Sequence, residues 1–363
     1  MKLLEITRSF YPSVGGLEKF VNDRLKIYGA LGIEYQLIST TFTNKKKDDI
    51  QKNKNVIFVK EYTPYNYTPK LKNFLSKDYD VVSINQIGRY FSDKAILYYG
   101  KLGKKIILTP HFTFHTPKFK LIKQVHNYLL TKKLLEKCTR IICFTEFEKN
   151  YWINNYRLSE ERVVVIPHYF EIIETNQPHN YTDEKYLFYL GRADKNKRLD
   201  LLITSFNSIK NKEYGLKLTI SLDDLSHKIK KIVLADKRIE LLGNISESEK
   251  NKYLNDCSAL VYPSEFEAFG HSLLEGANFK KPVICSNLKV FNEILDKRGV
   301  LYFENTTESI TNTLSKFYKI DCDHKKQMGL FNFNNLYKYS YPIILEKYKK
   351  LFSEILFQSK NGL

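Results

Sequence analysis

The chain has 363 residues and a formal net charge of +18, and 43% of its residues are hydrophobic. This length predicts two domains of about 100–200 residues each. The sequence contains no run of about 18 apolar residues, so we expect no transmembrane helix. The early acid Glu5 argues against a signal peptide, so we expect a cytoplasmic protein. The five cysteines lack paired spacing, which predicts reduced thiols and no zinc site.

The first half alternates apolar runs with helical patterns, as parallel α/β sheets do. Strands are predicted at residues 2–7, 35–40, 56–59, 80–84, 105–109, 140–144 and 163–167. Between the first strand and a helix expected at 17–31 lie Gly15 and Gly16. Paired glycines let a loop fold over a phosphate without an obstructing side chain, although Gly-Gly before a helix is often only a turn.

A histidine follows the strand at 105–109. The sequence Thr-Pro-His places His111 at the carboxyl end of the strand, where open α/β sheets bind ligands. His115 is four residues further on, and either histidine could serve a structural role.

Positive charge is concentrated in the first half, where residues 1–165 carry a net +14 and the remainder +4. Within residues 115–140, apolar side chains alternate with lysines, among them Lys118, Lys120, Lys123, Lys132 and Lys133. A basic amphipathic helix of this kind suits an anionic membrane surface. The pattern equally fits a helix that packs on the core and leaves its lysines in solvent.

A polar stretch at 175–184 predicts a linker, and the alternation then resumes. Strands are expected at 186–190, 216–221, 239–242, 259–262, 282–285 and near 300. Arg192 and Lys197 lie on the loop between the first of these strands and a helix at 199–209. Two cations on such a loop can converge on one diphosphate.

The segment from Pro263 to Glu275 carries the most information. A buried strand ends at the proline, Glu267 lies in the turn, and a helix is expected from residue 272 to 279. Backbone N–H groups at Phe269 and Gly270 would then form an anion site at the helix start, with Glu267 and Glu275 on either side.

This segment, with Lys-Lys-Pro-Val-Ile after it, resembles the acid-x7-acid signature of retaining GT-B glycosyltransferases of the family 4, or group 1, type. The resemblance extends over nearly the whole chain. It implies two Rossmann-like α/β domains whose parallel sheets face each other across a cleft. We expect residues 1–170 to form the acceptor-side domain and 180–341 the domain that binds the nucleotide sugar, with a helix within 342–363 packing back on the first domain.

In this family a sugar leaves a nucleotide diphosphate donor with retention of configuration. By the resemblance, Glu267 contacts the transferred sugar, Glu275 the ribose, and the amides of Phe269 and Gly270 the diphosphate. Arg192 and Lys197 neutralise the leaving diphosphate, His111 lies near the sugar, and the Gly15-Gly16 loop faces the donor. The donor's own phosphate oxygen takes the acceptor proton, so no general base, cofactor or metal is expected.

Two departures from the family pattern leave the donor base and sugar open. Pro167-His168-Tyr169-Phe170-Glu171 replaces the usual Pro-Asn-Gly-Val-Asp, and Leu222-Asp223-Asp224 replaces a glycine-rich turn. Asp321 and Asp323 lie beyond the last strand, so we predict no metal there.

The leading function is therefore hexosyl transfer to a carbohydrate or lipid-linked acceptor, with peripheral attachment to the inner face of a membrane as an expectation. An epimerase or hydrolase of the same fold is the alternative, because fold alone does not fix chemistry. A nucleic-acid-binding protein, suggested by the charge alone, lacks a binding motif, and we expect no nucleic-acid partner.

Overall fold

The computed structural model describes residues 1–11, 15–41, 55–62, 68–111, 121–173, 184–211 and 213–357. The chain forms two compact units. Unit 1 comprises Met1–Tyr169 and Tyr341–Leu363, and unit 2 comprises Phe170–Ser340. The predicted linker at 175–184 lies outside the described residues except for Glu184.

Unit 1 is built on a seven-stranded sheet with the order β3-β2-β1-β4-β5-β6-β7. Every neighbouring pair is parallel. The strands are β1 (Lys2–Thr7), β2 (Glu34–Thr41), β3 (Val56–Lys60), β4 (Val81–Asn85), β5 (Lys105–Thr109), β6 (Arg140–Cys143) and β7 (Val163–Val165). Its core is formed by buried side chains from these strands and from the helices beside them, such as Ile84, Leu108 and Phe91.

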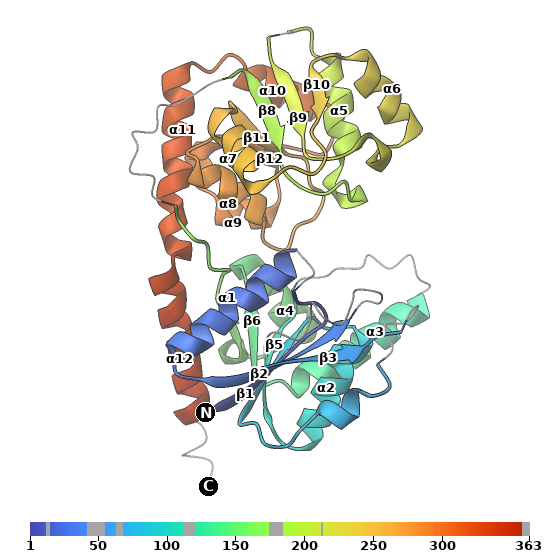
Figure 1. Ribbon diagram of the computed structural model, residues 1–363, viewed down its shortest axis with the longest axis vertical. Helices are drawn as coiled ribbons and strands as arrows, with labels where there is room; N and C mark the ends of the chain where they lie inside the picture. Colours follow the sequence, from blue (N-terminus) through green and yellow to red (C-terminus); the bar gives the residue numbers. More distant parts are fainter. Residues whose placement is uncertain are drawn as a thin grey trace. The chain divides into compact units, whose positions relative to one another are not determined.

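Helices from the described part of unit 1 accompany this sheet (Figure 1). They are α1 (Gly16–Ala30), α2 (Tyr90–Lys101), α3 (Leu121–Glu136), α4 (Glu146–Tyr156) and α12 (Tyr341–Phe357). Helix α12 packs against α1 through the rings of Tyr28 and Phe352, whose centroids are 5.8 Å apart. It also meets the sheet, because Lys105 donates a hydrogen bond to the carbonyl of Ile355.

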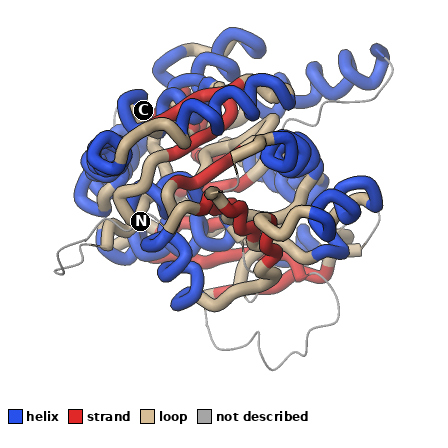
Figure 2. The backbone as a smooth tube through the Cα atoms, turned by 90° about the horizontal axis from the view of Figure 1, so that it is seen from above, coloured by secondary structure: helices blue, strands red, loops and turns tan. Residues whose placement is uncertain are grey.

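Unit 2 contains a six-stranded parallel sheet with the order β10-β9-β8-β11-β12-β13. The strands are β8 (Tyr186–Tyr189), β9 (Gly215–Leu218), β10 (Ile239–Leu241), β11 (Ala259–Tyr262), β12 (Val283–Ser286) and β13 (Val300–Phe303). The helices are α5 (Leu199–Ser208), α6 (His227–Ala235), α7 (Glu247–Asp256), α8 (His271–Asn278), α9 (Lys289–Ile294), α10 (Thr307–Phe317) and α11 (Cys322–Asn335). Figure 2 shows helices flanking the strands, as the two-sided burial of a parallel sheet requires.

Local sequence explains where several elements begin and end. Ser246 and Glu249 form a reciprocal capping box at the start of α7, and the Thr145 hydroxyl accepts from the N–H of Glu148 at the start of α4. Strand β9 ends at Leu218, three residues before the predicted end, because the Thr219 hydroxyl instead accepts from the N–H of Gly191. In the described part of the chain, no helix is long and apolar enough to cross a bilayer.

Candidate active site

The strand order of unit 2 reverses between β8 and β11, which are neighbours in the sheet although β9 and β10 lie between them in sequence. Loops leaving the carboxyl ends of two such strands run in opposite directions and open a crevice, which is where open α/β sheets bind ligands. The loop after β8 carries Arg192 and Lys197, and the loop after β11 carries Glu267. The fold therefore brings three predicted site residues to one point.

Lys197 and Glu267 are in direct contact. The Lys197 ammonium forms an ion pair with Glu267 Oε1, and both side chains are largely buried, with exposed fractions of 12% and 14%. The Ser264 hydroxyl donates to the same carboxylate oxygen at 3.2 Å. The carbonyl of Ser264 in turn accepts from the side chain of Asn305 at 3.1 Å, which ties the turn to the loop that follows β13.

The pKa of Lys197 is lowered to about 8, mainly by burial; the charge of Asp194 opposes this shift and that of Arg192 adds to it. The ammonium also lies 5.2 Å from the centre of the Tyr262 ring. The carboxylate and the ring hold the ammonium in one place, from which it can donate a charge-assisted hydrogen bond to an anionic ligand.

Arg192 lies on the same loop but points into solvent. Its side chain is 88% exposed and pairs with Asp194 at 3.1 Å. Its carbonyl accepts a hydrogen bond of 2.7 Å from the Tyr189 hydroxyl, which ties the loop to the end of β8. The backbone is thus anchored, while the guanidinium is exposed and paired with Asp194.

Helix α8 begins directly after Gly270, which has a φ of 97° in the left-handed region that glycine adopts without strain. The first N–H groups of a helix have no intrahelical acceptor, so this end of α8 suits an anion. The Phe269 side chain is buried and packs against the ring of Tyr339. Phe269 can therefore contribute only its backbone amide to ligand binding.

Glu275 lies one turn inside α8 and pairs with Lys250 of α7 at 3.1 Å. Burial lowers the pKa of Lys250, but Glu275 and Glu247 outweigh this effect and the net shift is upward. Tyr262, at the end of β11, and Ser272 of α8 are joined by a hydrogen bond, and burial raises the pKa of Tyr262 to about 12. The ion pair with Lys250 thus fixes the Glu275 side chain on α8.

In unit 1, His111 follows β5 with a φ of 57°. Asn85 donates from Nδ2 to the carbonyl of Ile6, so its Oδ1 is the acceptor that faces His111 Nε2 at 3.0 Å. Nε2 therefore carries the proton and Nδ1 is an acceptor. Burial, with the charge of Arg24, lowers the pKa of His111 to about 3, so the imidazole is neutral at physiological pH.

A buried polar network supports His111, and the sequence motifs did not predict it. Arg24 is fully buried and contacts Glu5, Asn85 and Thr109. The Tyr28 hydroxyl donates to the second oxygen of Glu5 at 2.8 Å. A charged residue inside an apolar strand, as Glu5 is in β1, was the one available signal for such a network.

Gly15 and Gly16 lie at the start of α1, and residues 12–14 before them are outside the described part. A Cβ at Gly15 would come within 2.8 Å of the Glu18 carboxylate, whereas one at Gly16 would meet nothing within 4 Å. Glu18 is itself held by the Ser9 hydroxyl. The close approach of a carboxylate thus explains one of the paired glycines.

The basic stretch is described only in part. Lys118 and Lys120 lie outside the described residues, and for Lys123 only the backbone is described, within α3. Further along α3, Tyr128, Leu129 and Leu130 are exposed next to Lys132 and Lys133, while Leu134 and Leu135 are buried in the core. The same helix therefore packs on the core and presents apolar side chains to solvent.

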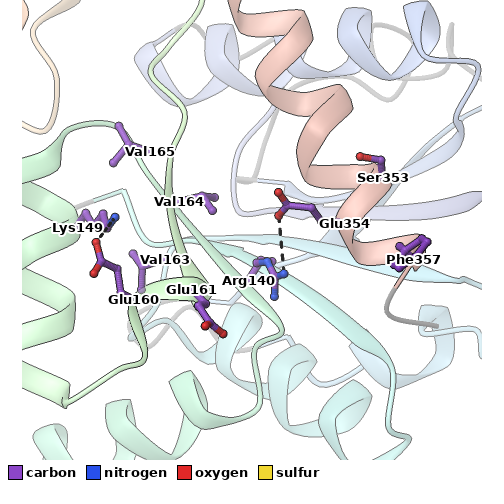
Figure 3. Close-up of a pocket in the computed structure, with 10 residues that line it drawn as sticks. All are labelled: Arg140, Lys149, Glu160, Glu161, Val163, Val164, Val165, Ser353, Glu354 and Phe357. Atoms are coloured by element: carbon purple, nitrogen blue, oxygen red, sulfur yellow. Dashed lines mark hydrogen bonds and ion pairs between the residues drawn. The ribbon is translucent and has the colours of Figure 1, made fainter. Parts of the chain in front are cut away.

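None of the predicted site residues lines the open pocket in Figure 3, which has a volume of about 810 Å³. It lies in unit 1 between β7 and the end of α12, with Arg140 and Glu354 paired at 3.8 Å.

Among the described residues, no group of three or more His, Cys, Asp or Glu side chains could hold a metal. Asp321 instead caps α11 by accepting from the N–H of His324.

Comparison with known families accounts for both halves of the chain. Residues 171–330 match the family "Glycosyl transferases group 1", and residues 14–171 match "Glycosyltransferase Family 4". The phosphatidylinositol N-acetylglucosaminyltransferase gpi3 subunit of Schizosaccharomyces pombe is 24% identical over 375 aligned positions, covering 98% of this chain and 80% of that protein.

Solved structures share the fold. A sucrose-phosphate synthase from Thermosynechococcus elongatus superimposes with a TM-score of 0.78 at 16% identity, over 99% of both chains. Anabaena HepE in complex with UDP and glucose superimposes with a TM-score of 0.75 at 15% identity, over 98% of this chain and 100% of that one.

Proposed function

Because the chain belongs to the group 1 glycosyltransferases of GT-B fold, we propose that it moves a hexose or related sugar from a nucleotide diphosphate to an acceptor hydroxyl with retention of configuration. The observation that carries this proposal is the Lys197–Glu267 ion pair at the point where the strand order of unit 2 reverses. The complex of Anabaena HepE with UDP and glucose supports a nucleotide-sugar donor.

In this proposal, the donor lies over the start of α8. Arg192 and Lys197 neutralise the diphosphate as the bond from the sugar to the phosphate oxygen breaks and its electron pair leaves with the diphosphate. The amides of Phe269 and Gly270 bind the same group, Glu275 binds the ribose, and Glu267 binds the sugar hydroxyls. To His111 and the Gly15-Gly16 loop of unit 1 we assign the roles that the family resemblance gives them, near the sugar and facing the donor.

The acceptor oxygen forms its bond to the sugar on the face that the diphosphate leaves, and its proton passes to a donor phosphate oxygen. His111 is neutral and accepts through Nδ1, so we assign it a hydrogen bond from a sugar hydroxyl and no proton transfer. These reaction steps need no metal ion, so glycosyl transfer should persist in excess EDTA.

A lipid-linked or glycan acceptor at an anionic membrane surface fits the described part of α3. Its exposed Tyr128, Leu129 and Leu130 can insert shallowly while Lys132 and Lys133 meet anionic lipid. The relative from S. pombe is named for transfer to phosphatidylinositol, which supports a lipid acceptor here.

Donor binding is the direct test. UDP-, GDP- and ADP-hexoses should be compared by thermal shift, because a ligand at 100 times its Kd stabilises the folded state by about 2.7 kcal/mol. We expect the hexose donors of one nucleotide base to raise the melting temperature of the wild type and of the Lys195→Ala control. They should not raise that of Arg192→Ala. No shift with any donor would contradict the proposal. Donor turnover without an acceptor would favour an epimerase or hydrolase instead.

A further inference from the structure

Unit 1 has its own point of strand-order reversal, between β1 and β4. An arginine follows each of these strands. Arg8 comes directly after β1, and Arg89 comes four residues after β4, just before α2. In the parallel register Ile6 lies beside Ile84, so both arginines leave the same edge of the sheet from neighbouring strands. Neither residue is used in the proposed donor site.

Arg8 is fixed in this position. Its guanidinium pairs at 3.3 Å with Glu61, whose carboxylate also accepts from the Thr40 hydroxyl at 2.6 Å. The Arg8 side chain is 21% exposed and that of Glu61 is 1% exposed. The carboxylate is thus committed to buried partners, while the guanidinium retains an accessible side.

Arg89 has a different environment. Among the described residues, its partly buried guanidinium forms no hydrogen bond and no ion pair. Burial lowers its pKa, the charge of Arg8 lowers it further, and Glu61 and Asp93 offset only part of this effect. An anion bound at this edge, in addition to the Glu61 carboxylate, would offset the free-energy cost of burying the Arg89 charge. It would also reduce the repulsion between the two arginines.

We propose that Arg8 and Arg89 bind a phosphate or diphosphate group of the acceptor. The inference rests on the proposed glycosyl transfer, for which the family resemblance makes unit 1 the acceptor-side domain. Two planar guanidinium groups that approach from neighbouring strands can each donate a pair of hydrogen bonds to phosphate oxygens. The acceptor is then a phosphorylated glycan or a lipid phosphate, and a neutral oligosaccharide lacks the group that these residues recognise.

The test measures binding rather than turnover, so it does not depend on knowing the transferred sugar. The protein is first saturated with the nucleoside diphosphate that binds best, which occupies the cations of unit 2, and is then titrated with octyl phosphate or inorganic pyrophosphate by calorimetry. We expect Arg89→Gln to weaken binding by about tenfold, the loss typical of one charge-assisted contact. The control Arg157→Gln removes the same charge from an exposed position in unit 1 and should change binding by less than twofold.

Further measurements test whether Arg89 recognises the phosphate and which acceptor carries it. Arg89→Lys keeps the charge and should recover part of the affinity, which separates recognition from misfolding. Tighter binding of octyl phosphate than of pyrophosphate would indicate a lipid phosphate, and the reverse order a soluble phosphorylated acceptor. Equal losses in Arg89→Gln and Arg157→Gln, or no binding of either probe, would overturn the inference. It would leave the donor assignment intact, because donor binding is measured separately.

Discussion

The ammonium group of Lys197 contacts the carboxylate of Glu267 although 70 positions separate the two residues in the sequence. The cation assigned to the diphosphate and the acid assigned to the sugar are therefore direct neighbours. A substitution at either residue changes the environment of the other, so their effects on turnover should not be independent.

We expect Lys197→Met and Glu267→Gln each to lower transfer by about 10²–10³, the usual cost of one preorganised charge contact. The double variant should be less than about tenfold slower than the slower single variant, because the pair acts as a unit. Steady-state kinetics on the four proteins measures this coupling. Lys195→Met, an exposed lysine of the same loop, is the control and should retain normal turnover. Strictly multiplicative effects would show that the two residues act separately.

Gly270 and Gly16 should differ sharply when each is changed to alanine. At Gly270 the backbone has a φ of 97°, and a Cβ would lie 3.1 Å from both Ile294 and Phe291. We expect Gly270→Ala to lower the free energy of unfolding by about 1–3 kcal/mol. Gly16→Ala meets no atom within 4 Å and should change it by less than about 0.5 kcal/mol. Urea unfolding compares the two, and equal losses would mean that the turn before α8 tolerates a side chain.

Asp93 offers a test by pH. Burial raises the pKa of Asp93 to about 6, against hydrogen bonds from the N–H groups of Gly88 and Arg89 that lower it. Between about pH 4 and pH 6 the folded state holds a proton that the unfolded state has released, so the free energy of unfolding falls as the pH rises through this window. The contribution of Asp93 to the free energy of unfolding is fully present below about pH 4 and is lost above about pH 6.

The variant Asp93→Asn removes that titration while keeping an oxygen acceptor for the Gly88 N–H. It should gain about 1–3 kcal/mol over the wild type at pH 8 and much less at pH 5. Denaturant titrations at the two pH values measure the difference. Asp323→Asn makes the same chemical change at an exposed position and should show no such trend. A gain that is equal at both pH values would contradict the raised pKa.

Membrane attachment can be tested on the described part of α3. The wild type should sediment with anionic vesicles at low salt, remain free with neutral vesicles, and dissociate as salt screens the attraction. Replacing Leu129 and Leu130 by serine should reduce the bound fraction, as should glutamine at Lys118, Lys120, Lys123, Lys132 and Lys133. Leu234→Ser, at a 72% exposed position in unit 2, is the control. Equal binding to both vesicle types would leave α3 as a solvated face and favour a soluble acceptor.

The fold was predictable because each buried strand is a short apolar run bounded by polar turns. The predicted β1 and β5 agree with the structure at both ends, and β7 ends two residues early, at Val165. Family resemblance led to the loops that carry Lys197 and Glu267. It could not show that the two side chains touch, because that contact depends on the order of strands in the sheet.

Other features left little trace in the sequence. The pairing of Lys250 with Glu275 joins two helices, and although the acid-x7-acid signature includes Glu275, no pattern singles out Lys250 as its partner. The Arg24 network depends on side chains from α1, β1, β4 and β5 that meet only in the folded unit. Such contacts follow from packing, which periodicity and local propensity do not specify.

Helix α12 belongs to unit 1 although all of unit 2 precedes it in the chain. Its Ile344, Tyr348 and Ile355 are buried there. During synthesis on the ribosome, residues 170–340 can therefore fold while unit 1 still lacks part of its core, which reverses the usual order in which amino-terminal domains finish first. Until α12 emerges, the surface that it will cover exposes apolar side chains, and at that stage the nascent chain should depend most on chaperones.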